Sequence, residues 1–459
     1  MKKLTKKGQI LLYAASGLGI NMLNLMMNSY LCSALLVGGF GEAAVPFQTF
    51  AQKDLVLNDP LLHLRSLTLW GLFVLIAKIV DGVIDVPMAA FTDALRSRWG
   101  RRRPSLIIGM VPLLLSYLLF LVIPQQGATL LNTLYYGVIL CVFYTSYTLT
   151  MVTYYATYTE IVDSTEARNL MSNAKSVFDI VYFILGYVGV RAMLNGINIR
   201  PVALMVLPLS MTMLIPLFMI RESSSLDGRA GGEEGSRTVN LISSLRYTFR
   251  NRPFIIWMLV YSFMTFGVQL FLGGINEYFS YVGMSMIQVM IAAFVPVPFT
   301  LMLYNRILRR RGFGFAFRYA LLTFSIGMLS MFGVSLLGQG MTKTALSIAA
   351  GLVSSLAIGA LFAVAYSVPS QLAAEEEERS GVSNSAMYFA VQGLFSGVAT
   401  GIGTGLVLNA LKGTQSAASG AIRFMTLIAA AGTLLSFVLS YTLPRSMSEL
   451  GKTEKEPQA

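Results

Sequence analysis

Residues 221–252, RESSSLDGRAGGEEGSRTVNLISSLRYTFRNR, separate two sets of long apolar runs. This stretch contains Ser223-Ser-Ser, Gly231-Gly-Glu-Glu-Gly and six arginines, so it has too little apolar content to pack on its own. On both sides of it the chain consists mainly of apolar runs of about 18 residues or more, each long enough to cross a bilayer as a helix. We therefore interpret residues 221–252 as a linker between two membrane-embedded halves.

Six apolar runs precede this linker and six follow it, which predicts an all-α membrane protein of about 12 transmembrane helices. The predicted organisation is an N-terminal six-helix half (1–220), a cytoplasmic linker (221–252), a C-terminal six-helix half (253–443) and a cytoplasmic tail (444–459). The spans are expected near residues 10–37, 67–93, 105–124, 133–159, 176–194, 201–220, 253–281, 286–308, 316–337, 344–370, 384–411 and 421–443.

The composition agrees with this organisation. Charged residues make up 12% of the chain and the mean hydropathy is +0.65, whereas an ordinary soluble domain has roughly 25% charged residues. The single histidine, His63, and the two cysteines, Cys32 and Cys141, offer no metal-ligand spacing. We expect no cofactor and no metal beyond a transported coupling ion, and no intramembrane enzyme, because no nucleophile and base recur at helical spacing.

The net charge of +12 is distributed in the pattern that sets membrane orientation. If both termini are cytoplasmic, 26 lysines and arginines, with Lys175 among them, fall on the cytoplasmic side and seven on the other, while Lys78 lies inside a span. No soluble basic module with a groove-reading element is present, so we expect no nucleic-acid partner. The count predicts a multi-pass protein of the plasma membrane with both termini in the cytoplasm.

The segment Lys78-Ile-Val-Asp-Gly-Val-Ile-Asp-Val-Pro87 places three ionisable residues in the second predicted span. At 100° per residue, Lys78, Asp81 and Asp85 share one helix face. Charges near the bilayer centre cost several kcal/mol and are typical of functional sites. Two carboxylates and one ammonium could bind a small cation or share a proton. The alternative is a structural ion-pair cluster that fixes this helix to a neighbour.

Two further polar stripes are candidates for a solute site. Asn21, Asn24 and Asn28 repeat the 3-then-4 spacing of one helix face, so their amides could contact a polar solute or complete a cation shell. The fourth span carries many hydroxyl groups, among them Tyr147, Thr148 and Tyr155, which is too polar for a wholly lipid-facing helix. The alternative for both stripes is hydrogen bonding and packing between helices.

The second half also supplies polar residues that could face a solute. Gln269 lies in the seventh predicted span, and Tyr388 and Gln392 lie in the eleventh. We take these three as candidate solute ligands that face the first half's polar stripes. The acidic run Glu375–Glu378 is interpreted instead as a solvated cytoplasmic loop without a site.

Asp81, Asp85 and the following Thr92-Asp-Ala-Leu-Arg-Ser-Arg-Trp-Gly-Arg-Arg-Arg-Pro104 resemble the glycoside/pentoside/hexuronide:cation symporters, the melibiose permease group of the major facilitator superfamily. The resemblance extends to Asn251-Arg-Pro-Phe254 and Met387-Tyr-Phe-Ala-Val-Gln392. It implies the major facilitator fold and alternating access, with sodium or a proton bound by Asp81 and Asp85.

The same resemblance implies roles for other residues. Asp93, Arg98, Arg101 and Arg102 would close the cytoplasmic side through charge pairs. Asn24 would join the cation site. Solute contacts would come from Asn21, Lys78, Tyr147, Thr148, Tyr155, Gln269, Tyr388 and Gln392.

Four positions depart from the family pattern. Gly17 and Met151 stand where sugar-binding members carry aspartates, and Gly393 and Gly397 replace a threonine and a lysine. These departures remove the strongest acceptors for sugar hydroxyls. Taken as a whole, the sequence and its resemblance predict a monomeric, cation-coupled symporter of a glycoside-like solute. The alternatives are an uncoupled or amphiphile carrier of the same fold, and a membrane receptor that transports nothing.

Overall fold

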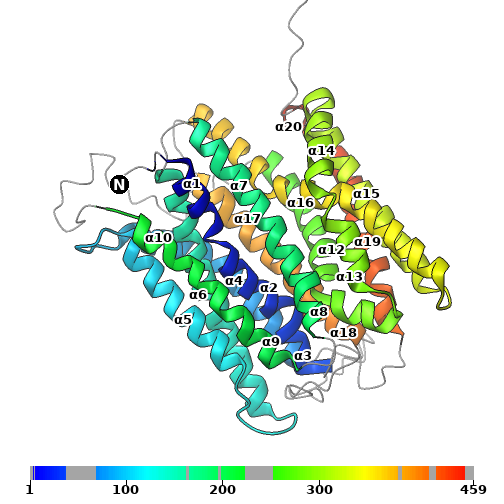
Figure 1. The fold of residues 1–459 in the computed structure, drawn as a ribbon. Coiled ribbons are helices and arrows are strands. Elements are labelled where there is room, and N and C mark those ends of the chain that lie inside the picture. The colour runs from blue at the N-terminus through cyan, green and yellow to red at the C-terminus, as the bar shows by residue number, and fades with distance from the viewer. Residues whose placement is uncertain are drawn as a thin grey trace, which may run out of the picture. The chain divides into compact units, whose positions relative to one another are not determined.

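The computed structural model describes residues 4, 6–37, 69–161, 165–194, 198–222, 252–380, 385–412 and 420–449 (Figure 1). Within these ranges the regular structure is entirely helical, which confirms the predicted all-α class. Ten described helical segments are long and apolar enough to cross a membrane. The predicted spans 67–93 and 176–194 also fall on helices, which carry charged residues. His63 lies outside the described residues.

The chain forms two compact units, residues 1–239 and 240–459. The helices of the first unit are α1 (Lys7–Ala15), α2 (Leu18–Met26), η1 (Met27–Leu31), α3 (Cys32–Val37), α4 (Leu69–Ala94), α5 (Arg102–Phe120), α6 (Leu130–Glu160), α7 (Thr165–Ile184), η2 (Leu185–Val190), α8 (Arg191–Met193), α9 (Ile199–Val206), η3 (Leu207–Met213) and α10 (Leu214–Met219). In this unit α6 packs against both α4 and α5, and α7 packs against α1 and α2.

Aromatic side chains fill the core between α4, α5 and α6. Trp70, Phe120 and Tyr136 are completely buried, and the Phe120 ring centre lies 6.4 Å from that of Trp70 and 5.1 Å from that of Tyr136. The opposite face of α5 exposes apolar residues such as Val111 and Leu115. This distribution is expected for a helix that faces its bundle on one side and lipid on the other.

The first predicted span contains a turn and a π-helical segment. A turn at Ser16 and Gly17 separates α1 from α2, and η1 follows α2 directly. The Tyr30 hydroxyl in η1 donates to the Gly186 carbonyl in η2 at 2.8 Å. In a π-helix the backbone bonding pattern shifts, and side chains can satisfy the carbonyls that this shift displaces. The π-helical segments η1 and η2 are therefore linked by this hydrogen bond.

The second unit contains α12 (Arg252–Val282), α13 (Met286–Phe294), α14 (Val297–Arg311), α15 (Phe313–Ser335), α16 (Met341–Ser380), α17 (Ser385–Thr400), η4 (Gly401–Val407), α18 (Leu408–Lys412), η6 (Ala421–Arg423), α19 (Phe424–Leu439), η7 (Ser440–Thr442) and α20 (Arg445–Ser448). Helix α12 packs against α17 and α19, and α16 packs against α13 and α15. The predicted span 286–308 is divided at Val295 and Pro296, where a proline removes a backbone donor.

Two predicted boundaries were wrong. Helix α7 begins at Thr165, about three turns before the predicted start at 176, so Lys175 lies inside a helix rather than in a cytoplasmic loop. Helix α16 continues to Ser380 and includes the run Glu375–Glu378, which was predicted as a loop. Both errors have one cause. Spans were placed by apolar content, but glutamate, lysine and arginine are good helix formers and extend a helix beyond its apolar part.

Candidate functional site

The polar face of α4 is the centre of the candidate site. Lys78 is buried, at 7% exposure, and its Nζ lies 3.6 Å from Oδ2 of Asp81, three residues later. The Asp81 side chain keeps 26% exposure, and Asp85 is half-buried one turn further on. The three residues therefore share one face of α4, as predicted, and this face lies in the middle of the helix rather than at its ends.

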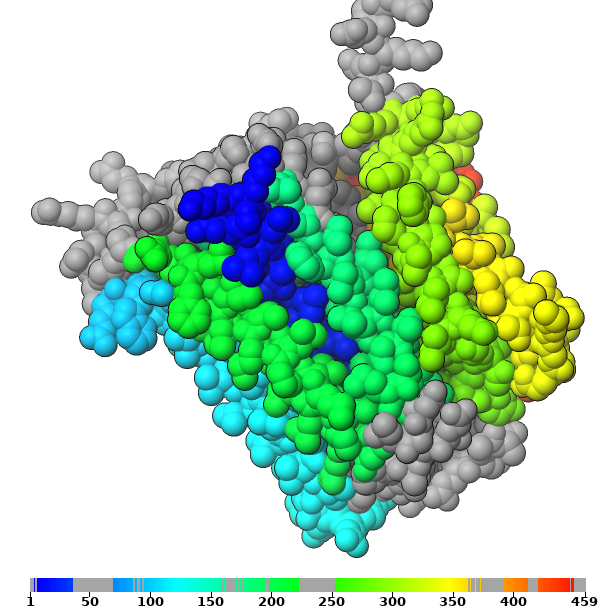
Figure 2. All heavy atoms as spheres, in the orientation of Figure 1, coloured from blue at the N-terminus to red at the C-terminus, as the bar shows by residue number. Residues whose placement is uncertain are grey.

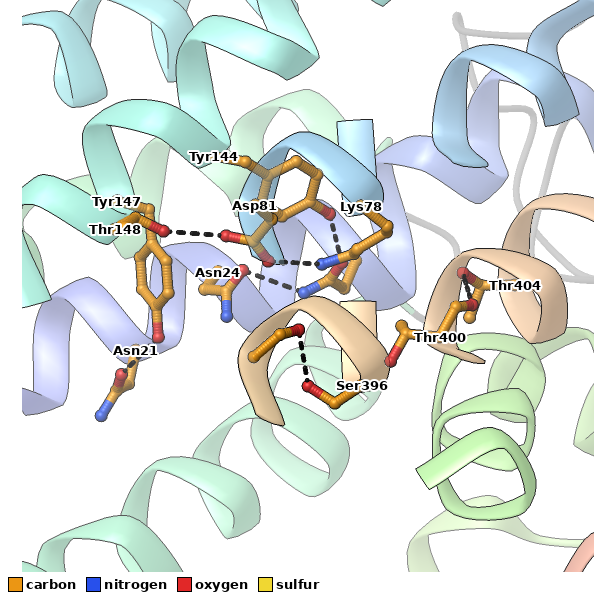
Figure 3. Close-up of polar contacts among 12 residues, drawn as sticks. Asn21, Asn24, Lys78, Asp81, Tyr144, Tyr147, Thr148, Ser396, Thr400 and Thr404 are labelled. Carbon is orange, nitrogen blue, oxygen red and sulfur yellow. Dashed lines mark hydrogen bonds and ion pairs between the residues drawn. The ribbon is translucent and has the colours of Figure 1, made fainter. Parts of the chain in front are cut away.

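Helix α6 supplies the hydroxyl that completes this face. Thr148 is nearly buried, and its Oγ1 donates to Oδ1 of Asp81 at 3.0 Å (Figure 3). Thr148 and Asp81 also interact with the Asp85 carboxyl. One threonine thus lies beside both carboxylates, as expected from the close packing of α4 on α6.

Lys78 is held from its other side by Tyr144 of α6. Its ammonium lies 3.7 Å from the centre of the Tyr144 ring, a distance at which cation–π attraction is favourable. The Tyr144 hydroxyl donates to Oδ1 of Asn28, and Nδ2 of Asn28 donates to Oδ1 of Asn24 at 2.9 Å (Figure 3). A continuous polar chain therefore links Asn24 in α2 to Asp81 in α4.

The third asparagine of the stripe contacts a different tyrosine. Asn21 of α2 is buried, and its Oδ1 accepts a hydrogen bond from the Tyr147 hydroxyl at 3.1 Å (Figure 3). Asn21 thus contacts α6 directly through Tyr147, whereas Asn24 reaches Tyr144 of α6 through Asn28. This contact fits both predicted roles, a solute ligand and an interhelical hydrogen bond.

The α4 face has the donors that a small cation requires. Asp81 and Asp85 offer carboxylate oxygens and Thr148 offers a hydroxyl oxygen, which are the hard ligands that small cations prefer. Lys78 is already a cation beside Asp81, so an added cation would compete with the ammonium for the same carboxylate. The described residues contain no group of three or more His, Cys, Asp and Glu side chains placed to hold a resident metal ion.

A second ion pair lies on α7 and was not predicted. Lys175 Nζ is 2.5 Å from Oδ2 of Asp179, one turn later, and the same ammonium lies 5.3 Å from the ring centre of Tyr155. Tyr155 was a predicted solute residue, and the structure places it beside this pair. The i, i+4 spacing of lysine and aspartate was visible in the sequence, but assigning Lys175 to a loop concealed it.

The candidates of the second unit lie in a helix–helix contact. Gln392 of α17 accepts a hydrogen bond from Nε1 of Trp257 in α12 at 2.8 Å, and both side chains are buried. The Tyr388 ring lies edge-on to Phe254, with centres 4.5 Å apart. Gln269 is half-buried on α12. Trp257, which the sequence analysis did not single out, thus fixes the predicted ligand Gln392 in this conformation.

Glu222, which the sequence analysis did not single out, bonds to the end of the loop between α4 and α5. Its Oε2 accepts a hydrogen bond from the backbone N–H of Arg102 at 2.8 Å, at the N-terminus of α5, where a carboxylate is favoured. The Arg102 guanidinium is buried and donates to Oγ1 of Thr92 at 3.3 Å. A predicted gating arginine therefore ties together the two helices that flank its loop.

The other predicted gating residues are placed less tightly. Arg98 is exposed, and its guanidinium lies 5.1 Å from the ring centre of Trp99. Arg101 is half-buried, and its carbonyl accepts a hydrogen bond from the Ser105 hydroxyl at 2.9 Å. Asp93 lies in α4 at a position whose side chain is outside the described part of the structure, so its pairing stays a prediction.

The positions that lack the expected aspartates are apolar and enclosed. A Cβ at Gly17 would lie 3.5 Å from the Tyr154 ring, in ordinary contact. The side chain of Met151 is buried, at 5% exposure. A carboxylate oxygen is therefore missing at both positions, and no carboxylate lies on the described residues of α1 or α2.

Comparison with known proteins gives the family and the fold. A family model described as MFS/sugar transport protein matches residues 63–445. An uncharacterized symporter of Synechocystis sp. is 29% identical over 136 residues, which cover 28% of this chain and 25% of the relative. The chain thus matches a minor part of this relative's length.

Two solved transporter structures illustrate the likeness of fold. The nucleoside transporter NupG has a TM-score of 0.58 at 12% identity, covering 95% of this chain and 98% of the other. A bacterial homologue of the lysosomal transporter Spinster, in an inward-facing and unoccupied conformation, has a TM-score of 0.57 at 13% identity, with 96% and 97% coverage. At this identity the likeness shows the fold alone, and it confirms the predicted major facilitator fold.

Proposed function

The chain belongs to the MFS/sugar transport protein family, and from this membership we propose that it is a symporter that couples the entry of a cation to that of a glycoside-like solute by alternating access. The cation is sodium or a proton. We place the protein in the plasma membrane as a monomer with cytoplasmic termini, following the distribution of its basic residues.

One observation carries the coupling proposal: a single buried hydroxyl lies beside two carboxylates in the middle of a membrane helix. Thr148 bonds to Asp81 and neighbours Asp85. A cation between these oxygens would neutralise the α4 face. A neutral site can change its access from one side of the membrane to the other, through the low-dielectric interior, at lower cost than a charged one. Lys78 would neutralise part of this charge while the site is empty.

The solute would bind next to the cation site, on α2 and α6. Asn21 and Asn24 on α2, and Tyr147 on α6, present amide and phenol groups beside Thr148. Tyr147 and Thr148 are adjacent in sequence. A shift of Thr148 when the cation binds can therefore move Tyr147, and with it the solute site. Amide and hydroxyl groups suit a solute with many hydroxyls.

A second candidate function is an amphiphile or uncoupled carrier. The observation that favours it is the apolar environment of Gly17 and Met151, beside the Tyr154 ring. A receptor that binds the solute without net flux would have the same site. Flux measurements separate this receptor from both carriers.

The decisive experiment is uptake of labelled hexosides and pentosides into proteoliposomes under imposed sodium or proton gradients. We expect gradient-driven uptake in the wild type and its loss in Asp81→Asn and Asp85→Asn. Asp227→Asn, the same chemical change in the predicted linker, is the matched control and should retain uptake. Detergent melting temperatures of all variants exclude unfolding as the cause.

Two outcomes would contradict the proposal. Uptake that needs no gradient and survives both α4 changes would make the aspartates structural and the protein a uniporter. Absence of uptake for every sugar, in protein that is folded and inserted, would favour the amphiphile carrier or the receptor.

A further inference from the structure

The Lys175–Asp179 pair on α7 is separate from the cation face on α4. The pair has a short contact of 2.5 Å and keeps part of its surface accessible, 17% for the lysine side chain and 34% for that of the aspartate. Lys175 is the described group that contacts the Asp179 carboxylate, and it does so through Oδ2. Among the side chains that the structure describes, none bonds to the other oxygen, Oδ1, so this oxygen can accept a hydrogen bond from a ligand.

The position of the pair on the helix indicates that it faces the bundle. Val177 of α7 is 56% exposed, as expected for a residue in contact with lipid. Asp179 lies about 200° around the helix from Val177, on the opposite face. Helix α7 packs against α1 and α2 (Figure 1). Because a lipid-facing charge costs several kcal/mol, the accessible carboxylate surface must border a polar space inside the bundle.

Three tyrosines lie near the Lys175–Asp179 pair. Lys175 lies over the Tyr155 ring, and Tyr182, one turn after Asp179, is within electrostatic reach of Asp179, Tyr147 and Tyr155. Tyr147 is the residue that donates to Asn21. The pair on α7 is therefore continuous with the predicted solute residues of α2 and α6.

This set of groups has the chemistry of a hydroxyl-binding site. A carboxylate accepts strong hydrogen bonds from hydroxyl groups, and an ammonium donates to hydroxyl oxygens. Tyrosine faces can cover the apolar face of a sugar ring. On the described parts of α1, α2 and α6 the sole carboxylate is Glu160, at the last position of α6. Asp179 is thus a carboxylate near Tyr182, and Tyr182 in turn lies near Tyr147 and Tyr155.

We propose that Asp179 is the hydroxyl acceptor that selects the solute, and that Lys175 is a positioning residue that holds the carboxylate beside Tyr155 and Tyr182. The solute class is a neutral molecule with neighbouring hydroxyl groups, such as a glycoside or pentoside. This inference rests on the proposed symport function and deepens it, since it assigns solute selection to α7 and leaves cation binding to α4.

The test compares Asp179→Asn with the wild type in the proteoliposome uptake assay, using a transported methyl glycoside and its monodeoxy analogues as probes. We expect the change to raise KM about tenfold or more, the effect of losing one hydrogen bond to a charged group, while the dependence on the cation gradient persists. The wild type should discriminate against one deoxy analogue, and Asp179→Asn should not.

A charge-swapped variant separates a binding role from a structural one. Lys175→Asp combined with Asp179→Lys retains an i, i+4 ion pair, so restored KM and restored discrimination would show that the pair only stabilises the fold and would overturn the proposal. An unchanged KM in Asp179→Asn would also overturn it while symport stands. Absence of uptake in the wild type would instead overturn the symport function on which it rests.

Discussion

Thr148 shows how one side chain can serve two carboxylates. Its hydroxyl bonds to Asp81 and neighbours Asp85, so Thr148→Val removes an oxygen ligand and keeps the shape. We expect the apparent cation affinity to fall about tenfold or more. Thr148→Ser retains the hydroxyl and should stay within about threefold of the wild type. Cation titration of solute uptake measures both, and equal effects of valine and serine would exclude an oxygen ligand.

Gly100 shows a second residue-scale constraint, in the loop before α5. Its φ is +82°, and a Cβ there would lie 2.3 Å from Oε2 of Glu222, the group that caps Arg102. Gly100→Ala should lower the free energy of unfolding by about 1–3 kcal/mol through backbone strain and the displaced carboxylate. Gly127 has a φ of +85° with open space around it, so Gly127→Ala isolates the strain. Equal losses in the two variants, measured by thermal melting in detergent, would show that the Glu222 contact contributes nothing.

At the scale of elements, the approach of α2 to η3 depends on one glycine. A Cβ at Gly19 would lie 1.9 Å from the Leu209 carbonyl oxygen, so Gly19→Ala must separate the two helices. Overpacking of this kind costs about 1–3 kcal/mol. Gly8→Ala, in α1 with open space around it, is the control and should be neutral or slightly stabilising, because alanine has the higher helix propensity. A Gly19→Ala variant as thermally stable as Gly8→Ala would mean that the helices do not pack this closely.

The contact of α12 with α17 depends on a buried hydrogen bond. Trp257→Phe removes the donor to Gln392 and keeps most of the ring, while Gln392→Leu removes the acceptor. In a double-mutant cycle we expect a coupling of about 1 kcal/mol in the free energy of unfolding, because each single change leaves one buried polar group without its partner. A coupling near zero would show that this bond is absent in the membrane. The KM of Gln392→Leu tests separately whether this residue binds solute.

At the scale of the whole molecule, the charge asymmetry predicts the orientation. Lys175 lies in α7, which leaves 25 basic residues on the cytoplasmic side against seven on the other. The loop before α5 should therefore be cytoplasmic and the loop after it external. In a variant without Cys32 and Cys141, Gln126→Cys should react with a membrane-impermeant maleimide on intact cells. Ser97→Cys should react after permeabilisation. The opposite labelling pattern would invert the proposed topology.

The surface of the first unit is apolar, as the low charged fraction of the sequence predicts. Helices α9 and α10 reach the surface of this unit (Figure 2). Their apolar side chains Leu204, Met205 and Phe218 are exposed. An apolar surface of this extent is typical of lipid contact in a membrane protein. The low charged fraction already implied this surface. What composition could not indicate was which charged residues lie inside the helices.

Helix content and family were predictable because both depend on local pattern. Apolar run length identifies membrane helices, and the segment from Asp81 to Arg103 carried the resemblance that the family comparison confirms. Helix ends were not predictable in the same way. Lys175 and the run Glu375–Glu378 continue helices although they are polar, because helix propensity does not follow hydropathy.

The sequence by itself determined the fold class, the common face of Lys78, Asp81 and Asp85, and the asymmetry of basic charge, because each follows from periodicity or counting along one chain. The tertiary structure decided the partners across helices. The contacts of Thr148 with Asp81 and of Tyr144 with Lys78 join residues more than 60 positions apart. Such pairs depend on how helices pack, and no pattern along a single helix encodes which neighbour a side chain will meet.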